Sequence, residues 1–427
     1  MNDWTVWLTW IIFAVTYAGL ALGMVPGLRM DRAGIALVGA TLMLVTGVLS
    51  FEQAVSPESI DFKTLFLLFG MMIVVGVLRL SGFFERVVGV ALRRIVTPKG
   101  LLAVTIVLSG LLSAFLINDV VCVALTPLVL HLARRMKVDP IPHLIGLATA
   151  ANVGSTGTIT GNPQNIYIGL HSGISYVRFA VRLLPVAMLG LGFTYLVVCL
   201  VYRGRLAAPK EQDARDKDDA LAGGNHDEGM PRSRAHARLQ VKAVVVTVIA
   251  VTLFFTGLPL ELVALGAAAV LLLDRIKPAK VYRQVDWSLL VMFTGLFIVV
   301  HAFQIHVVSR WGIENWQWLL SRPVVLLSVV SAGLSNLVSN VPAVLLLEPV
   351  AQAVPVATRE TAWLSLAMSS TFAGNLTVLG SVANLIVVES AGREGVKISF
   401  WEYCKVGIPL TVLTLVLGIA WLQFVHY

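Results

Sequence analysis

Charged side chains are scarce in this sequence. Asp, Glu, Lys and Arg make up 13% of its 427 residues, whereas hydrophobic residues make up 57%. A water-soluble domain carries about twice that share of charge. Apolar runs of bilayer-spanning length recur from end to end, whereas the strands of an outer-membrane barrel would be short and alternating. The composition therefore predicts an all-α polytopic membrane protein.

Cysteines and catalytic motifs are scarce as well. The three cysteines, Cys122, Cys199 and Cys404, lie far apart and form neither a CxxC pair nor a metal-ligand spacing. The sequence has no HExxH motif, no GxSxG elbow and no pair of aspartates suited to adjacent helices. No basic cluster is interleaved with aromatic residues, as in many nucleic-acid-binding proteins. We therefore expect no enzyme, no metal site, no cofactor and no nucleic-acid partner.

The charges that are present predict the topology. The N-terminal segment MNDWTVWLTW lacks the basic flank and cleavage site of a signal peptide, and its tryptophans are typical of a membrane interface. Loops rich in Arg and Lys alternate with acidic loops, and the basic loops stay in the cytoplasm. We expect a multi-pass protein of a bacterial inner membrane with a periplasmic N-terminus.

One segment of the first half is too short to cross the membrane. Residues 101–116 and 120–132 are apolar, basic residues flank the pair, and Asn118 and Asp119 separate the two arms. This pattern predicts a re-entrant hairpin with its tip at Asn118 and Asp119. Such a turn is tolerated at membrane depth only where it is buried in protein or lines a wet cavity.

The next segment predicts a broken helix. A helix that begins at Pro142 is expected to break between Asn152 and Asn165 and to resume at Ile166, because glycines, a proline and many hydroxyls and amides fill the gap. A discontinuous membrane helix indicates the binding site of a transporter.

The second half repeats the first. Three blocks recur at nearly equal offsets along the chain: Asp61…Gly70 with Asp286…Gly295, Ser113…Asn118…Pro127 with Ser335…Asn340…Pro349, and Leu147…Asn165 with Leu366…Asn384. Offsets this similar across irregular elements indicate an internal repeat. We expect one membrane repeat in residues 1–205, a polar cytoplasmic linker in 206–239 and a second membrane repeat in 240–427.

The loop charges predict that the two repeats are inverted. The span at Phe62 follows an acidic loop, whereas the matching span at Trp287 follows a basic one. The second hairpin, at Ser335 to Glu348, should therefore enter the membrane from the opposite side. The predicted fold has about ten transmembrane helices plus two re-entrant hairpins, in two inverted-topology repeats with discontinuous helices.

These irregular elements carry a family resemblance. The tips Ile117-Asn118-Asp119 and Ser339-Asn340-Val341-Pro342, and the breaks GSTGTITGNPQN and AGNLTVLGSVAN, resemble those of the ion transporter superfamily. Its members include arsenite and antimonite efflux pumps of the ArsB type, NhaD-type sodium/proton antiporters, and sodium-coupled dicarboxylate and citrate carriers. The Asn-Asp tip is similar to that of the first two branches. The resemblance implies an elevator-like motion, a homodimer and, for the arsenite pumps, an ATPase subunit on the cytoplasmic side.

Polar residues at the tips and breaks are the predicted binding site. Freed backbone groups and half-helix dipoles there can hold a small polar solute or an ion. The predicted binding residues are Asn118, Gly154, Ser155, Thr156, Thr158, Asn162, Ser339, Asn340, Gly374, Asn375 and Thr377. The alternative is that these groups only cap broken helices.

Asp119 is the predicted proton-coupling residue. A carboxylate inside a membrane costs several kcal/mol unless it is protonated, paired or hydrated, so it indicates a functional site. Asp119 could instead cap the second hairpin arm. Glu348 is the other ionisable residue within a hairpin, and it matches Thr126 across the repeat.

These observations favour a secondary transporter driven by a proton or sodium gradient. The first hypothesis is proton-coupled efflux of neutral arsenite or antimonite, As(OH)3 or Sb(OH)3. The second is a sodium-coupled carrier, either a sodium/proton antiporter or a symporter of a small anion such as a dicarboxylate or sulfate. The expected partners are the lipid bilayer and a small polar solute or ion.

Overall fold

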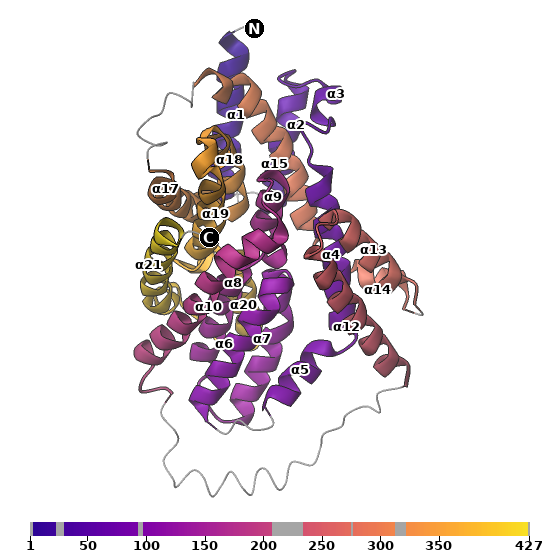
Figure 1. The fold of residues 1–427 in the computed structure, drawn as a ribbon, viewed down its shortest axis with the longest axis vertical. Helices are drawn as coiled ribbons and strands as arrows, with labels where there is room; N and C mark the ends of the chain where they lie inside the picture. Colours follow the sequence, from indigo (N-terminus) through magenta and orange to yellow (C-terminus); the bar gives the residue numbers. More distant parts are fainter. Residues whose placement is uncertain are drawn as a thin grey trace, which may run out of the picture.

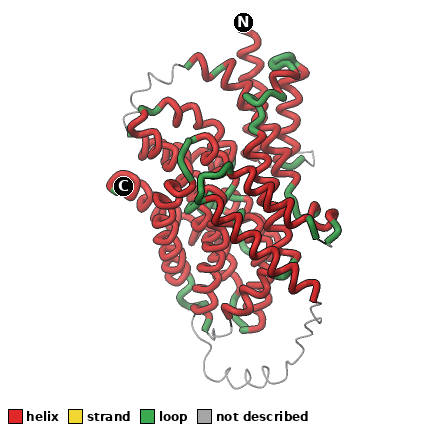
Figure 2. Tube along the Cα trace, turned by 45° about the vertical axis from the view of Figure 1, so that its right-hand side comes forward, coloured by secondary structure: helices red, strands yellow, loops and turns green. Residues whose placement is uncertain are grey.

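The described part of the chain consists of helices joined by short loops. The computed structural model describes residues 3–22, 30–92, 97–206, 234–274, 276–311 and 322–425, and within these ranges it contains no strand (Figure 2). Seven of the described helices are long and apolar enough to cross a bilayer. The protein is therefore an all-α polytopic membrane protein, as the composition predicts.

The first repeat contains three spans, a hairpin, a broken helix and a last span. Its elements are α1 (Asp3–Leu22), α2 (Arg32–Val45), α3 (Phe51–Ala54), α4 (Phe62–Leu80), α5 (Phe83–Leu92), α6 (Pro98–Phe115), α7 (Asn118–Arg135), α8 (Pro140–Ser155), η1 (Ile159–Gly161), α9 (Pro163–His171) and α10 (Tyr176–Val201). The hairpin is α6–α7, and the broken helix is α8–η1–α9.

The second repeat has the same order of elements. They are α12 (Arg234–Phe254), α13 (Leu260–Leu272), α14 (Pro278–Tyr282), α15 (Trp287–His306), η2 (Val308–Arg310), α17 (Pro323–Val338), α18 (Asn340–Ala353), α19 (Val356–Ala373), η4 (Val378–Gly380), α20 (Val382–Arg393) and α21 (Phe400–Phe424). The α6–α7 hairpin occupies the lower part of the molecule and α17–α18 the upper part (Figure 1). The hairpins thus lie toward opposite ends, as inverted repeats require.

The predicted bounds of the first break were wrong. The helix before it continues to Ser155 and the helix after it begins at Pro163, so the break is shorter than the predicted 152–165. Proline fits the first turn of a helix, which explains the early restart. Helix α12 begins at Arg234, inside the segment predicted as a linker. Residues 207–233 of that linker lie outside the described residues.

Two glycines explain why one block of residues recurs in both halves of the chain. Helix α4 packs on α13, and α15 packs on α2. A Cβ atom on Gly70 would lie 2.7 Å from the carbonyl carbon of Ala264, and a Cβ atom on Gly295 would lie 2.7 Å from that of Ala36. The two glycines are repeat equivalents. Each repeat therefore uses one glycine to bring the third span of its own copy against the second span of the other.

We expect Gly70→Ala to destabilise this crossing by about 1–3 kcal/mol, because the added methyl group overlaps backbone that cannot move independently. The midpoint of thermal unfolding in detergent measures the effect. Gly266→Ala, on α13 itself, is the matched control. A Cβ atom there meets nothing within 4 Å, so this variant should be neutral or more stable by up to about 1 kcal/mol. Equal midpoints for the two variants would contradict the close packing.

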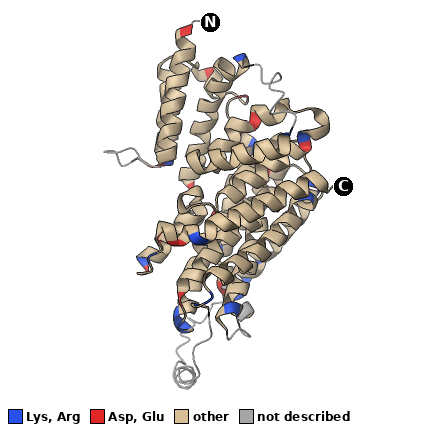
Figure 3. Cartoon of the chain, turned by 90° about the vertical axis from the view of Figure 1, so that its left-hand side faces the viewer, with Lys and Arg blue, Asp and Glu red and all other residues tan. Residues whose placement is uncertain are grey.

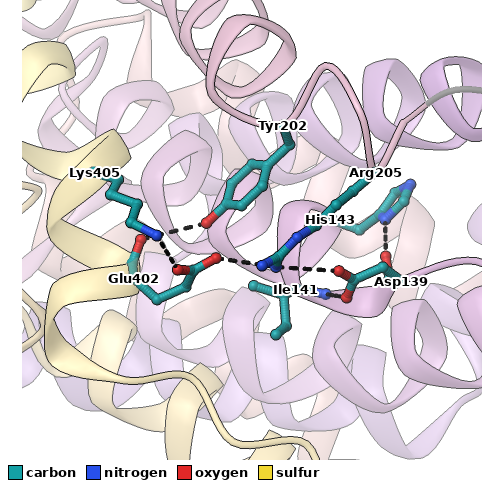
Figure 4. Close-up of polar contacts among 7 residues, drawn as sticks. All are labelled: Asp139, Ile141, His143, Tyr202, Arg205, Glu402 and Lys405. Atoms are coloured by element: carbon teal, nitrogen blue, oxygen red, sulfur yellow. Dashed lines mark hydrogen bonds and ion pairs between the residues drawn. The ribbon is translucent and has the colours of Figure 1, made fainter.

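Most of the helical length is uncharged, and the charged residues lie in scattered short segments, many of them near helix ends (Figure 3). One charged network joins α8, α10 and α21 (Figure 4). Arg205 Nη1 lies 3.3 Å from Asp139 Oδ2 and 3.0 Å from Glu402 Oε1, and Lys405 Nζ lies 2.7 Å from Glu402 Oε2. Asp139 also caps α8. Because Arg205 and Lys405 are about half-exposed, these pairs contribute modest stability.

Candidate functional site

Asn152, in the last turn of α8, joins both repeats at the centre of the molecule. Its Oδ1 accepts hydrogen bonds from Asn118 Nδ2 at 3.0 Å and Ser381 Oγ at 3.1 Å. Its Nδ2 donates to Asn375 Oδ1 at 2.9 Å and Asn384 Oδ1 at 3.1 Å. This buried amide therefore uses its full bonding capacity. We call these five residues the amide cluster.

Two asparagines close the helix breaks in the same way. Asn165 Nδ2 donates to the carbonyl oxygens of Ser155 at 3.1 Å and Thr158 at 3.0 Å. Asn384 Nδ2 donates to those of Gly374 at 2.6 Å and Thr377 at 3.1 Å. The sequence repeat maps each set of atoms onto the other. These bonds satisfy carbonyl groups that the breaks would leave exposed at membrane depth.

The two broken helices also exchange contacts. Asn162 Nδ2 donates to Thr371 Oγ1 at 3.2 Å, and Ser381 Oγ donates to Asn152 Oδ1 at 3.1 Å. The repeat relates Asn162 to Ser381 and Asn152 to Thr371. The breaks therefore pack about a pseudo-two-fold relation, which is the arrangement that inverted repeats produce.

The predicted binding residues of the first break bond mainly within the protein. Ser155 Oγ donates to Asn152 O at 2.8 Å and accepts from Asn162 Nδ2 at 3.0 Å. Thr156 Oγ1 donates to Asn152 O at 3.3 Å, and Thr158 Oγ1 donates to Ala114 O. Gly154 allows α8 to approach α6, because its Cβ atom would lie 2.1 Å from Gly110 O. Capping and packing account for these contacts.

The second break is held partly by the tip of its own hairpin. With its amide oriented to donate, Asn340 Nδ2 lies 3.0 Å from Ser370 O and 3.3 Å from Gly380 O. In this orientation a Cβ atom on Gly374 would lie 3.2 Å from the Asn340 amide oxygen. Thr377 is half-buried at the same break. Asn340 therefore binds backbone, whereas its repeat equivalent Asn118 binds the side chain of Asn152.

The single residue that turns the second hairpin has an unusual backbone. Ser339 has φ 78° and ψ 161°, a region that is normally restricted to glycine and costs a serine about 1–3 kcal/mol. Arg32, the first residue of α2, places Nη1 3.4 Å from Ser339 Oγ. A backbone outlier at a predicted binding residue, with a guanidinium beside it, indicates a functional tip.

Asp119 lies in the first turn of α7 and is half-buried. The N-cap of α7 is Ile117, and no side chain caps this helix. The alternative that Asp119 is a capping residue was therefore wrong. The negative charge of Asp286, the N-cap of α15, acts electrostatically on Asp119. The two groups therefore influence one another, and Asp119 directly follows Asn118 of the amide cluster.

Several buried polar atoms at the hairpins have no partner among the described residues. They include Asn118 Oδ1, Ser113 Oγ and Ser335 Oγ. Asn118 is 4% exposed, and the two serines are repeat equivalents. Buried polar atoms are rarely left unpaired, so these atoms indicate where a polar solute can bind.

The sequence prediction missed five residues of these networks: Asn152, Asn165, Thr371, Ser381 and Asn384. Asn165 and Asn384 could have been found, because they are identical residues at equivalent positions of the repeat. Asn152 and Thr371 are also equivalent but differ in type, so the repeat gives no signal for them. Their contacts join opposite halves of the chain, which sequence spacing does not reveal.

The opposed hairpins, the paired helix breaks and the polar centre define a secondary transporter. Among the described residues no three His, Cys, Asp or Glu side chains form a group that could hold a metal ion. The family described as "Citrate transporter" (CitMHS) matches residues 7–373. The chain belongs to this family of membrane transporters.

Individual relatives agree with this assignment. The chain is 33% identical to the silicon efflux transporter LSI3 of Oryza sativa subsp. japonica, with 96% of each chain covered. It is 30% identical to a 46 kDa membrane protein of Mycobacterium leprae, with 97% of each covered. It is 24% identical to the putative transporter arsB of Dictyostelium discoideum, over 92% of this chain and 87% of that protein. The family and two of these named relatives are transporters, so the chain is a transporter and not an enzyme.

The fold also has a solved relative. The Alcanivorax borkumensis YdaH transporter, whose crystal structure is described as having an unusual topology, has a TM-score of 0.58. The match covers 98% of this chain and 96% of that one at 16% identity. At this identity the likeness shows the fold alone.

Proposed function

We propose that this protein exports a small neutral hydroxide, trivalent arsenite or antimonite, in exchange for protons. The amide cluster is the observation that carries the proposal. Its described side-chain members are amides and one hydroxyl, and Asn118 Oδ1 is buried without a donor. An uncharged solute with several hydroxyl groups can donate to such an oxygen without leaving a buried charge unpaired.

Two relatives support an uncharged hydroxide as substrate. One is named a silicon efflux transporter and another a putative arsB transporter. Silicon and trivalent arsenic both occur in neutral water mainly as small uncharged hydroxides. Asp119, one residue from Asn118, is the proposed proton carrier.

The charge distribution supports an orientation. Lys and Arg side chains mark the lower end of the molecule in Figure 3, and basic loops stay in the cytoplasm. We place the lower end in the cytoplasm and the N-terminus in the periplasm of a bacterial inner membrane. The homodimer and the cytoplasmic ATPase subunit that the resemblance implies remain proposals.

Expression in a bacterial strain without its own arsenite efflux pump tests the substrate. The proposal expects growth at arsenite and antimonite concentrations that stop the strain carrying an empty vector, together with less arsenic inside the cells. Unchanged tolerance and unchanged arsenic content, with the protein present in the membrane, would contradict it.

A second candidate function is sodium-coupled transport of a small anion. The Arg32 guanidinium beside the strained Ser339 favours this candidate, because such a group can pair with a carboxylate. The family description as citrate transporters supports it too.

Arg32→Gln separates the two functions. An anion carrier should lose about tenfold or more in the apparent affinity for a dicarboxylate, since a charge-assisted contact contributes about 1.5–3 kcal/mol. An exporter of a neutral hydroxide should keep its apparent affinity for arsenite within about threefold, a change of less than about 1 kcal/mol. Concentration-dependent uptake into membrane vesicles measures both affinities.

A further inference from the structure

Glu348 is a buried carboxyl group that the shared fold of the two hairpins does not require. It lies in α18 and is 7% exposed. Its repeat equivalent is Thr126, whose hydroxyl donates to Cys122 O of its own helix at 2.7 Å. The same position can therefore be filled by a residue that needs no outside partner. Placing an ionisable side chain inside the membrane costs free energy, so its presence there indicates a function.

Neutral donors surround this carboxyl group. The hydroxyl group of Tyr167, on α9 of the other repeat, donates a hydrogen bond to Glu348 Oε2. Gln352 Nε2 donates to Oε1 at 2.9 Å. Neither of these two donors carries a charge. Hydrogen bonds from neutral donors thus stabilise the carboxylate in place of a paired cation. Protonation of Glu348 therefore leaves no buried positive charge without a partner.

Aromatic and ionisable groups connect Glu348 to the surface. The ring of Tyr167 stacks on that of His171, with centroids 4.1 Å apart. His171 Nδ1 lies 3.7 Å from Asp61 Oδ2, and the His171 side chain is 28% exposed. His171, at the end of α9, is therefore the most exposed of these residues. We call Asp61, Tyr167, His171 and Glu348 the α9 row.

Apart from the members of the α9 row, the ionisable groups on the helices that pack on α18 have other partners. His171 and Asp61 both act electrostatically on Glu348, and Tyr17 of α1 acts on Tyr167. Helix α17 carries no ionisable residue. On α19, Arg359 donates to Val354 O and Glu360 pairs with Arg178. On α15, His306 contacts Val48 O, and His301 interacts with Glu58 and His306.

The two hairpins then show a matched arrangement. The charge of Asp286, which caps α15, acts on Asp119 of α7, and the charge of Asp61, which caps α4, acts on Glu348 of α18. Asp61 and Asp286 are repeat equivalents. Each hairpin therefore carries one carboxyl group near the capping aspartate of one third span, although Glu348 lies farther from its tip than Asp119 does.

We propose that Glu348 is a second proton-carrying residue, which serves the upper hairpin as Asp119 serves the lower one. One proton from the side of His171 converts the Glu348 carboxylate to the neutral acid, and its release restores the charge. This inference rests on the proposed proton-driven function. It assigns the exposed end of the α9 row, at His171 and Asp61, as the side from which the proton reaches the hairpin, and this is the periplasmic side in the proposed orientation.

The test compares two assays in everted membrane vesicles, in which the periplasmic side faces the lumen. The first assay follows arsenite accumulation driven by an acidic lumen, over a series of luminal pH values. The second follows exchange of labelled for unlabelled arsenite at equal pH on both sides, which needs no net proton movement. The variants are Glu348→Gln and Tyr167→Phe, and the control is Thr126→Val at the equivalent position of the other hairpin.

Glu348→Gln should lower driven accumulation about tenfold or more and flatten its dependence on luminal pH, while exchange continues. Tyr167→Phe should shift the luminal pH dependence, and Thr126→Val should leave it unchanged. Wild-type behaviour of Glu348→Gln in both assays would overturn the inference. A parallel loss of accumulation and exchange would also overturn it, because it indicates a structural role.

Failure of the underlying function looks different. If the wild-type protein does not accumulate arsenite under any pH gradient, the proposed function fails before any variant is compared. If wild-type accumulation depends on the gradient and only Glu348→Gln leaves it unaltered, the inference alone fails.

Discussion

Asp119→Asn should lower pH-driven arsenite accumulation in everted vesicles by about 100-fold, the scale on which loss of a positioned proton-transfer group acts. Asparagine has nearly the same shape but cannot gain or lose a proton. The carboxylate is half-buried in the first turn of α7 and caps no helix. Its replacement therefore removes a titratable group without removing a bond that holds the hairpin, so exchange of arsenite at equal pH should persist.

Asp286→Asn is the matched control for this change. It removes the neighbouring carboxylate, which accepts a hydrogen bond from Leu289 N at the start of α15. Asparagine caps a helix about as well as aspartate does. The control should therefore keep pH-driven accumulation, with its dependence on luminal pH shifted because the charge that acts on Asp119 is removed. Full accumulation by Asp119→Asn would rule out the assigned proton-carrying role.

Asn152→Ala should abolish transport and lower stability by about 3 kcal/mol or more, because each buried donor or acceptor that loses its partner costs about 1–3 kcal/mol. The substitution leaves four buried partners with one bond fewer: Asn118, Asn375, Ser381 and Asn384. Because these partners come from both repeats, the two breaks should also lose their mutual alignment. Thermal unfolding in detergent and arsenite exchange measure the two effects.

Thr149→Val, one turn earlier on α8, is the comparison for this variant. Its hydroxyl is buried and donates to Ile145 O of its own helix at 2.6 Å. Valine keeps the shape, so the cost should be about 1 kcal/mol and exchange should continue. If Asn152→Ala is no less stable than Thr149→Val, Asn152 is not the centre of the site.

Most of the fold follows from the sequence because membrane helices depend on local properties. The α6–α7 hairpin was predicted from two short apolar arms around Asn118 and Asp119, and α4 begins at Phe62, where a span was predicted. The broken helices were predicted from glycine, proline and polar residues that no continuous span tolerates. The internal repeat then predicted the α17–α18 hairpin and the broken helix α19–α20 from their equivalents in the first half of the chain.

The contacts of the site could not be predicted in the same way. Whether Ser155 and Thr158 bind a solute or a carbonyl group depends on how α8 lies against α6, and the structure pairs both within the protein. The left-handed backbone of Ser339 has no sequence signal, because glycine is the residue expected there. Asn152 was missed because its partners, except for Asn118, lie in the other half of the chain.

The central claim is that a proton gradient drives a neutral hydroxide through this site. The most direct measurement is the flux of labelled arsenite, sodium and succinate into one preparation of proteoliposomes with an acidic lumen. We expect arsenite to accumulate until the pH gradient is dissipated, with sodium and succinate at the level of protein-free vesicles. Gradient-independent arsenite flux, or accumulation of succinate that requires sodium, would contradict the account.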